Sequence, residues 1–327
     1  MRINLIAWDN GFGLTRNLNL LRSALQAGGH DVHVSAIRRG KLRKVFGPWL
    51  LRARVAWTRL RGVPARRFDV NLMIEHVRRE YAPLARRSVL MPHPEWFLDS
   101  DRGALAVVDH VFALTRHAVP LFERLGKSVT YVGFTSEDRR DPQVPRERAF
   151  FHLAGRSQNK GTQALLALWR QHPEWPRLTV LQSPRTARPG PPAPNIEHRV
   201  DYLTDVELRR LQNAHRFHLC PSETEGFGHY LVEAMSVGAV TLTVDAPPMH
   251  EMVTSARGVL VPYARTGTQN LATTYFFDEA QMAAAIARTL ALSDAELDRI
   301  GAAARAWYEA NERAFHERIN AAVAALE

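Results

Sequence analysis

Two glutamates with seven residues between them stand out in the segment PSETEGFGHYLVEAMSVG, residues 221–238. Glu225 is followed at once by Gly226, and Gly228 comes two residues later. Glycines at these positions let a backbone approach a ligand closely, because they carry no side chain. Glu233 follows inside an apolar stretch. The segment therefore places two carboxylates around a point of close backbone approach.

A helix from about 229 to 237 is predicted to carry the second glutamate, with Gly238 in the left-handed conformation that ends it. Backbone amides at a helix N-terminus favour an anion such as phosphate. Glu225 would stand beside that N-terminus, and Glu233 would lie about one turn inside. A carboxylate there can accept two hydrogen bonds from a vicinal diol such as a ribose. The pattern predicts a binding site for a sugar nucleotide.

The loop DNGFGLTR, residues 9–16, offers a second glycine-rich site. Gly11 and Gly13 form a Gly-x-Gly pair after a strand-like segment, but a dinucleotide fingerprint would need a third glycine where Arg16 stands. The pattern therefore argues against an NAD site. Thr15 or Arg16 would add contacts with an anion.

The composition fits a protein of two globular domains with an anionic partner. A chain of 327 residues is too long for a typical single core, and its 46% hydrophobic and 23% charged residues are ordinary for globular proteins. The net charge of +10 predicts attraction to a phosphorylated small molecule, an acidic membrane face or nucleic acid. The single cysteine, Cys220, excludes an internal disulfide and fits a reducing compartment.

The basic residues are concentrated in residues 38–67, which contain eleven Lys or Arg and no acid. Apolar residues recur there at spacings of three and four, which predicts an amphipathic helix. They are Phe46, Leu50, Ala53, Trp57 and Leu60. Two interpretations remain open: a domain helix with a solvated basic face, or an interfacial helix that docks on anionic lipid or on an acceptor.

Strand and helix patterns alternate along the chain, as is typical of parallel sheets with helical crossovers. The strand-like segments are 2–7, 31–37, 69–75, 88–93, 110–114, 128–134, 149–155, 178–183, 217–222 and 239–245. Capping boxes that begin at Thr204 and Ser293 predict two helix starts. The polar stretch 135–148 is the predicted linker. The predicted fold class is α/β, with two doubly wound domains and a ligand site beyond the carboxyl ends of their strands.

The segment 221–238 resembles the E-x7-E signature of retaining GT-B glycosyltransferases, specifically the group 1, family 4-like enzymes. Residues 154–169, AGRSQNKGTQALLALW, resemble the Gly-Arg…Lys-Gly segment of that family. Residues 195–222 resemble the elements that lead into the signature, and residues 108–126 resemble the last helical unit of the N-terminal domain. The resemblance runs along nearly the whole chain.

This resemblance implies the GT-B fold, in which two Rossmann-like domains face each other across a cleft. The N-terminal, acceptor-side domain would cover residues 1–140. The nucleotide-sugar-binding domain would cover residues 141–305. A C-terminal helix, residues 306–327, would cross back to the first domain.

The resemblance also assigns roles to single residues. Arg156 and Lys160 would hold the donor diphosphate and neutralise it as it leaves. Glu225 would contact hydroxyls of the donor sugar, and Glu233 would bind the ribose. Further donor-binding positions implied in this way are Gly155, Phe227, Gly228, Tyr230, Leu231, Gly11 and Gly13.

Two histidines and one further acid are weaker candidates. His93, in MPHPEW, follows a strand and resembles the N-terminal-domain histidine that lies beside the donor sugar in the family. His76 is a candidate for acceptor binding. Glu251 stands where the family often has an acid after a glycine pair, which is replaced here by Pro247-Pro248.

The resemblance implies a retaining hexosyltransferase that takes a nucleotide-diphosphate sugar without a metal or other cofactor. The donor base is left open between UDP and GDP, and UDP is favoured. The acceptor is expected to be anionic or membrane-associated, as in the synthesis of polysaccharides or glycoconjugates. The alternatives are a non-catalytic sugar-nucleotide-binding protein and a DNA-modifying glycosyltransferase, although nucleic acid is not the favoured partner. With no signal peptide and no apolar run of the ~18 residues that span a membrane, the expected location is cytoplasmic or peripheral at the inner membrane face.

Overall fold

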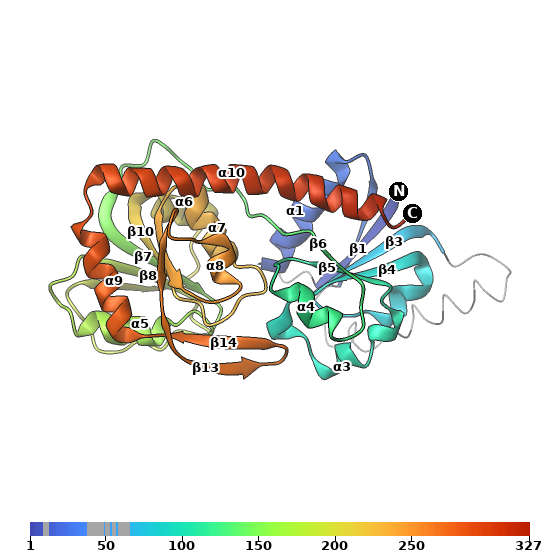
Figure 1. Cartoon of the computed structure of the whole chain (residues 1–327), viewed down its shortest axis with the longest axis horizontal. Helices are drawn as coiled ribbons and strands as arrows, with labels where there is room; N and C mark the ends of the chain where they lie inside the picture. The colour runs from blue at the N-terminus through green and yellow to red at the C-terminus, as the bar shows by residue number, and fades with distance from the viewer. Residues whose placement is uncertain (9–12, 38–48, 50–52, 54–56, 58–65) are drawn as a thin grey trace. The chain divides into compact units, whose positions relative to one another are not determined.

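The structure is a computed structural model of the whole chain, and it describes residues 1–8, 13–37, 49, 53, 57 and 66–327 (Figure 1). Gly11 lies outside the described residues. So does most of the basic segment 38–67. Of the residues on which the amphipathic helix was predicted, only Ala53 and Trp57 are described, and both are helical.

The chain divides into two compact units. The first contains Met1–Phe134 and Arg313–Glu327, and the second contains Thr135–Glu312. The boundaries predicted from the sequence were 140 and 305.

The first unit contains a six-stranded parallel sheet in the order β2-β1-β3-β4-β5-β6. Its strands are β1 (Arg2–Trp8), β2 (Asp31–Ile37), β3 (Phe68–Ile74), β4 (Ala85–Met91), β5 (His110–Ala113) and β6 (Val129–Tyr131). The chain starts at β1, adds the edge strand β2 on one side and then β3 to β6 on the other, so the strand order reverses between β1 and β3. That reversal is where doubly wound sheets bind ligands.

The helices of the first unit include α1 (Gly13–Ala27), the single turn α3 (Asp99–Arg102) and α4 (Ala118–Glu123). Helix α1 buries Leu21 and Leu25, and it contacts β1 and β2. The end of α10 (Asp294–Ala324) also belongs to this unit: Phe315 packs on Phe134 with ring centroids 4.9 Å apart, and Asn320 donates to the Ala24 carbonyl.

The second unit repeats this plan, with a parallel sheet in the order β12-β11-β10-β7-β8-β9. Its strands are β7 (Glu147–Gly155), β8 (Leu178–Gln182), β9 (Ile196–Val200), β10 (His215–Cys220), β11 (Val240–Val244) and β12 (Val259–Val261). Strand β7 begins the unit and lies between β10 and β8. The order therefore reverses at β7, and the loops that follow β7 and β10 meet at that point.

The helices of this unit are α5 (Thr162–Arg170), α6 (Asp205–Ala214), α7 (His229–Ser236), α8 (Met249–Met252), α9 (Glu279–Ala291) and most of α10. Helix α6 contacts β7 and β10, and α7 contacts β10 and β11. Both capping boxes are confirmed: the Thr204 hydroxyl accepts the Glu207 N–H, and the Ser293 hydroxyl accepts the Glu296 N–H. Gly238 has a φ of +66°, the left-handed conformation predicted for the residue that ends α7.

All ten predicted strand segments are confirmed. Strand β9 is the first of the elements that the resemblance implied for residues 195–222. The sequence did not predict β12 or the antiparallel hairpin of β13 (Tyr263–Gln269) and β14 (Ala272–Phe277), which stands apart from the main sheet (Figure 1). Most of β13 is solvent-exposed, so it lacks the alternation of apolar and polar residues by which a half-buried strand is recognised. Among the described residues, no helix combines the length and the apolar character needed to cross a membrane.

Candidate functional site

The turn between β10 and α7 forms the centre of the candidate site. Gly228 is the N-cap of α7 and has a φ of +102°, a conformation that L side chains rarely adopt. A Cβ at this position would also lie 2.8 Å from Cδ1 of Leu231. The first amides of a helix have no partner within the helix and carry its positive dipole end. The glycine thus allows a tight turn that brings the start of α7 directly behind Glu225.

Lys160 and Glu225 form an ion pair across this turn, and both side chains are only 13% exposed. The carboxylate oxygen that contacts Lys160 also accepts a hydrogen bond from the Ser222 hydroxyl. The Lys160 ammonium lies 3.6 Å from the centroid of the Tyr230 ring, a cation–π contact. The predicted cation is therefore held by a carboxylate on one side and an aromatic face on the other.

Tyr230 closes this cluster from the first turn of α7. Its hydroxyl lies 2.5 Å from the Ser222 hydroxyl. Burial, followed by the nearby Cys220 and Glu225, raises the pKa of Tyr230 well above its ordinary value. The phenol stays protonated, so it remains a hydrogen-bond donor beside Lys160.

The loop from Gly155 to Gly161 carries both predicted cations, Arg156 and Lys160. Gly155 ends β7 with a φ of +56°, and Gly161 precedes α5 with a φ of +62°. A Cβ on Gly161 would lie 2.6 Å from the Pro221 carbonyl oxygen, so this loop packs directly on the loop after β10. Arg156 is half-buried immediately after Gly155.

A buried histidine, His152, lies next to the loop from Gly155 to Gly161 and holds its surroundings together. His152 Nδ1 lies 2.7 Å from the Leu219 carbonyl, and its Nε2 lies 2.9 Å from the hydroxyl of Thr162. Burial lowers the pKa of His152 to about 4, so the ring is neutral at ordinary pH. A neutral ring can donate from Nδ1 to the carbonyl while Nε2 accepts the hydroxyl. His152 therefore ties β7 to β10 and to the start of α5.

Glu233 is 2% exposed, and a chain of hydrogen bonds supports its carboxylate. Gln212 donates to Glu233 Oε2 at 2.7 Å, and Arg139 Nε donates to Gln212 Oε1 at 2.9 Å. Arg139 is itself buried and pairs with Asp205 at 2.8 Å. The sequence prediction named Glu233 alone. Gln212 and Arg139 were missed because neither lies in a recognisable motif.

Three further predicted positions of the second unit are Phe227, Leu231 and Glu251. Phe227 and Leu231 are buried, and the Phe227 ring meets the His229 ring edge-on at 5.3 Å. Glu251 lies in the short helix α8, whose neighbours include Arg257, a donor to the Glu251 carbonyl. The structure thus places Glu251 after β11, beyond a different strand from the one that leads to Glu225.

In the first unit, His93 follows β4 and lies beside an acid that follows β3. His93 Nδ1 is 3.5 Å from Glu75 Oε1. Glu75 has a φ of +71°, unusual for a residue other than glycine and a sign of a functional position. Burial would raise the pKa of Glu75, but the hydrogen bond from His93 and the charges of His93, His76 and Arg78 lower it below its ordinary value. The sequence prediction did not include Glu75.

His76 has a partner of its own. Its Nδ1 lies 2.8 Å from Asp101, whose other carboxylate oxygen accepts the Val77 N–H at 2.9 Å. His76, Glu75 and His93 thus form one polar cluster beyond the ends of β3 and β4. Gly13, also predicted in this unit, is the first residue of α1, and Thr15 and Arg16 lie in its first turn.

A second pocket of the second unit was not anticipated. It has a volume of about 300 Å³ and lies between the start of α5, the loop after β8 and the hairpin β13–β14. Glu223 and Arg265 line it, and burial raises the pKa of Glu223 although Arg265 lowers it. Arg265 stacks on Phe276, 3.4 Å from the ring centroid. Arg265 was missed because the hairpin that carries it was not predicted, and Glu223, two residues before Glu225, was given no role in the sequence analysis. Across the described ranges, no cluster of three or more His, Cys, Asp or Glu residues could hold a metal ion.

Comparison with solved structures defines the class of the fold. A sucrose-phosphate synthase from Thermosynechococcus elongatus superimposes with a TM-score of 0.70 at 16% identity, covering 100% of this chain and 99% of that one. Anabaena HepE in complex with UDP and glucose gives 0.69 at 15% identity, covering 99% and 100%. An E. coli structure described as trehalose-6-phosphate bound with UDP-2-fluoro glucose gives 0.70 at 11% identity, covering 100% and 99%. These similarities and the two parallel-sheet units show that the fold is GT-B.

A comparison with protein-family models gives a match over one part of the sequence. Residues 194–307 match the family model described as Glycosyl transferases group 1. The matched region contains Glu225, Glu233 and the whole of α7, but not Arg156 or Lys160. No curated protein sequence matches the chain.

Proposed function

We propose that this protein is a retaining glycosyltransferase that takes its sugar from a nucleotide-diphosphate donor. The observation that carries the proposal is the arrangement around α7. Lys160 lies in front of the helix beside Tyr230 of its first turn, and Glu233 is buried one turn further along. The match of residues 194–307 to the group 1 glycosyltransferases supports the same interpretation.

The diphosphate would bind at the start of α7. Backbone amides of a helix N-terminus and two cations, Lys160 and Arg156, would stabilise the negative charge that grows as the diphosphate leaves. Positive groups that are fixed before the reaction cost no reorganisation during it. These groups would do the work that a metal ion does elsewhere, so we propose a metal-independent reaction.

The ion pair of Lys160 with Glu225 has a role in this scheme. An incoming diphosphate competes with Glu225 for the Lys160 ammonium, because both are anions that pair with the same cation. Once Lys160 turns to the diphosphate, Glu225 keeps the Ser222 hydroxyl as a donor and gains capacity to accept hydroxyls of the donor sugar. Donor binding would thus prepare both residues together.

The nucleoside would lie along α7, with its ribose hydroxyls on Glu233. Gln212 and Arg139 hold that carboxylate in one orientation, which a bidentate contact with a diol requires. We propose UDP as the nucleotide. Its support is that HepE and the E. coli structure above were each obtained with a UDP compound, at low sequence identity to this chain.

In the same scheme, His93 of the first unit would contact the donor sugar or the acceptor, with Glu75 as its positioning partner. The retaining outcome would follow front-face chemistry: the departing diphosphate oxygen helps to take the acceptor proton, and the acceptor attacks from the same side. An anionic or membrane-associated acceptor remains part of the proposal, since the net charge is +10.

A ligand screen with activity readouts tests the proposal. UDP, GDP, ADP and their sugars are compared by thermal shift, where a ligand at a hundred times its Kd should stabilise by about 2.7 kcal/mol. UDP-sugars should shift the melting temperature and turn over slowly in water, and proton NMR should show the α-anomer released first. Binding without turnover, even with acceptor extracts, would make this a sugar-nucleotide-binding protein. If no nucleotide shifts the melting temperature, the proposed donor site is wrong.

A further inference from the structure

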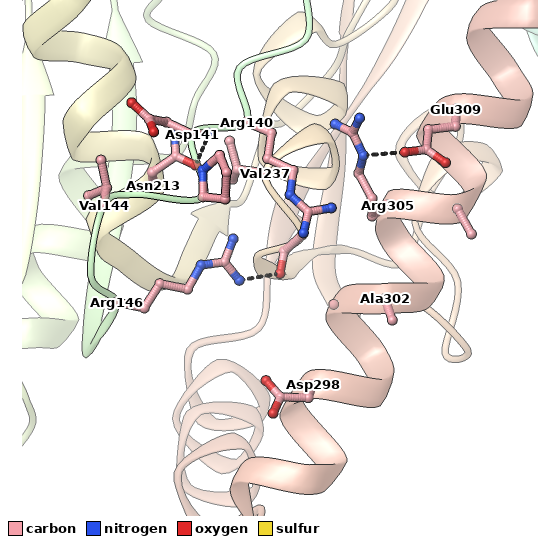
Figure 2. Close-up of a pocket in the computed structure, with 14 residues that line it drawn as sticks. Arg140, Asp141, Val144, Arg146, Asn213, Val237, Asp298, Ala302, Arg305 and Glu309 are labelled. Carbon is pink, nitrogen blue, oxygen red and sulfur yellow. Dashed lines mark hydrogen bonds and ion pairs between the residues drawn. The ribbon is translucent and has the colours of Figure 1, made fainter.

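Another cavity, distinct from the pocket lined by Glu223 and Arg265, lies at the far end of α7 from the candidate donor site (Figure 2). Its volume is about 560 Å³, and it lies entirely within the second unit. Its wall is formed by the segment 140–146, Asn213 near the end of α6, Val237 and Gly238 after α7, and the middle of α10. Gly228 and Gly238 bracket α7, and a helix rises ~1.5 Å per residue, so about 15 Å separates this cavity from the start of α7.

The acids of α10 that line the cavity already have cationic partners. Glu309 accepts from Arg305 at 2.7 Å, and Asp298 accepts from Arg216 at 2.5 Å. Arg305 is also held by both carboxylate oxygens of Asp138, at 2.6 and 2.7 Å. These pairs neutralise one wall of the cavity.

Two arginines on the opposite wall have no carboxylate partner within the part of the chain that the structure describes. Arg146 donates to the Gly238 carbonyl at 2.9 Å, and the Arg140 guanidinium makes no hydrogen bond or ion pair with any residue in the described ranges. Figure 2 shows the carboxylate of Asp141 pointing away from the guanidinium groups of Arg140 and Arg146. Both side chains are solvent-exposed at the cavity. Partial loss of hydration, and then the neighbouring cations Arg216 and Arg140, lower the pKa of Arg146, and the nearby carboxylate of Asp298 offsets this only in part.

The carbonyl end of a helix ordinarily repels an anion. At the end of α7 that repulsion is offset, because the Ser236 carbonyl accepts from Arg305 and the Gly238 carbonyl accepts from Arg146. The anion would therefore meet guanidinium N–H groups rather than bare carbonyl oxygens.

We infer that this cavity binds a phosphate-bearing small molecule, with its phosphate between Arg140 and Arg146. Arginine suits this task because its planar fork donates two parallel hydrogen bonds to phosphate oxygens. The volume of about 560 Å³ lies within the range of small-molecule sites and exceeds what inorganic phosphate alone would fill. The ligand class is therefore a phosphate monoester such as a sugar phosphate. The site is separate from the donor site and does not depend on the proposed function.

Isothermal titration with inorganic phosphate and with glucose 6-phosphate tests this inference. The parent protein carries Arg156→Gln and Lys160→Gln, which removes the cations of the candidate donor site. Glucose 6-phosphate should bind the parent saturably and more tightly than inorganic phosphate does. Adding Arg140→Gln and Arg146→Gln should raise its Kd at least about tenfold.

A matched control adds Arg102→Gln and Arg124→Gln instead, two exposed residues of the first unit that change the net charge equally. This control should keep the parent Kd within about twofold. Arg140→Gln alone should raise the Kd by at least about threefold. Because this change removes no interaction with the described residues, it still tests the inference if the double variant folds poorly. An undiminished affinity in both cavity variants, an equal loss in the control, or no saturable binding by the parent would each overturn the inference.

Discussion

Glu75 and His93 face each other at the ends of the adjacent strands β3 and β4, with 3.5 Å between Glu75 Oε1 and His93 Nδ1. The backbone of Glu75 is in the left-handed region, at a φ of +71°. Such strain persists only where the surroundings enforce it, and it concentrates at functional sites. The strained residue therefore places a charged acceptor that fixes the orientation of the histidine ring.

Glu75→Gln is predicted to lower turnover by about tenfold, because the amide holds the His93 ring less firmly than the carboxylate does. The Kd for UDP should change less than about twofold, since the proposed nucleotide site lies in the other unit. Glu123→Gln, an exposed acid of the first unit, is the control and should behave like the wild type. Steady-state kinetics and titration measure the two quantities. A change in UDP affinity with normal turnover would contradict the positioning role.

Lys160→Met should lower kcat by about a hundredfold or more, because the leaving diphosphate loses a fixed cation. Methionine retains the contact with the Tyr230 ring but removes the charge. The variant Glu225→Gln removes the partner of Lys160 and should reduce kcat by a smaller factor, with tighter binding of UDP alone. If Lys160→Met and Glu225→Gln shift UDP affinity in the same direction, the two residues do not compete as proposed.

Glu233→Ala should weaken UDP binding by about ten- to a hundredfold, the worth of one or two hydrogen bonds to a charged group. Gln212→Leu should weaken it less, but should lower the free energy of unfolding by about 1–3 kcal/mol, since it removes the buried amide that hydrogen-bonds to both Glu233 and Arg139. Titration calorimetry and urea unfolding separate the two effects. If Glu233→Ala and the wild type bind UDP equally well, Glu233 does not bind the ribose.

The second unit is predicted to lose stability as the pH falls below about 6.5. Burial lowers the pKa of His152 to about 4 and that of His218 to about 3, so the folded state stays neutral while the unfolded chain takes up protons near pH 6.5. Because the unfolded state binds more protons in this window, the free energy of unfolding decreases as the pH decreases. At pH 5 the loss is about 2 kcal/mol for each histidine. Urea unfolding of His218→Gln should show a shallower pH slope than the wild type. The exposed His33→Gln should keep the full slope.

Gly161→Ala should destabilise the protein by about 2 kcal/mol or more and displace the loop that carries Arg156 and Lys160. Its Cβ would lie 2.6 Å from the Pro221 carbonyl, and its φ of +62° already disfavours alanine. Gly126→Ala is the control: Gly126 has a φ of +76°, but a Cβ there would meet nothing within 4 Å among the described residues, so only the backbone cost of about 1 kcal/mol remains. Similar melting temperatures for the two variants would show that the loop contact matters little.

The order of elements followed from the sequence because it rests on local patterns. Alternating apolar runs, glycine stops and the boxes at Thr204 and Ser293 each act within a few residues of the chain. The hairpin at 263–277 was not predicted because most of β13 is exposed and the two strands pair mainly with each other. Period-two patterns arise only where one face of a strand is buried.

The sequence by itself determined the parallel α/β class, the start of α7 and the acids beside it, since residue type and spacing are sufficient for these. Only the tertiary structure decided which side chains meet: Glu75 with His93, Gln212 and Arg139 behind Glu233, and Arg140 beside Arg146 around a cavity. The first two sets of partners come from segments separated along the chain, and Arg140 and Arg146, although they share one segment, meet around a cavity that α6, α7 and α10 complete. Their contacts depend on burial and direction in space, and neither leaves a periodic mark in the sequence.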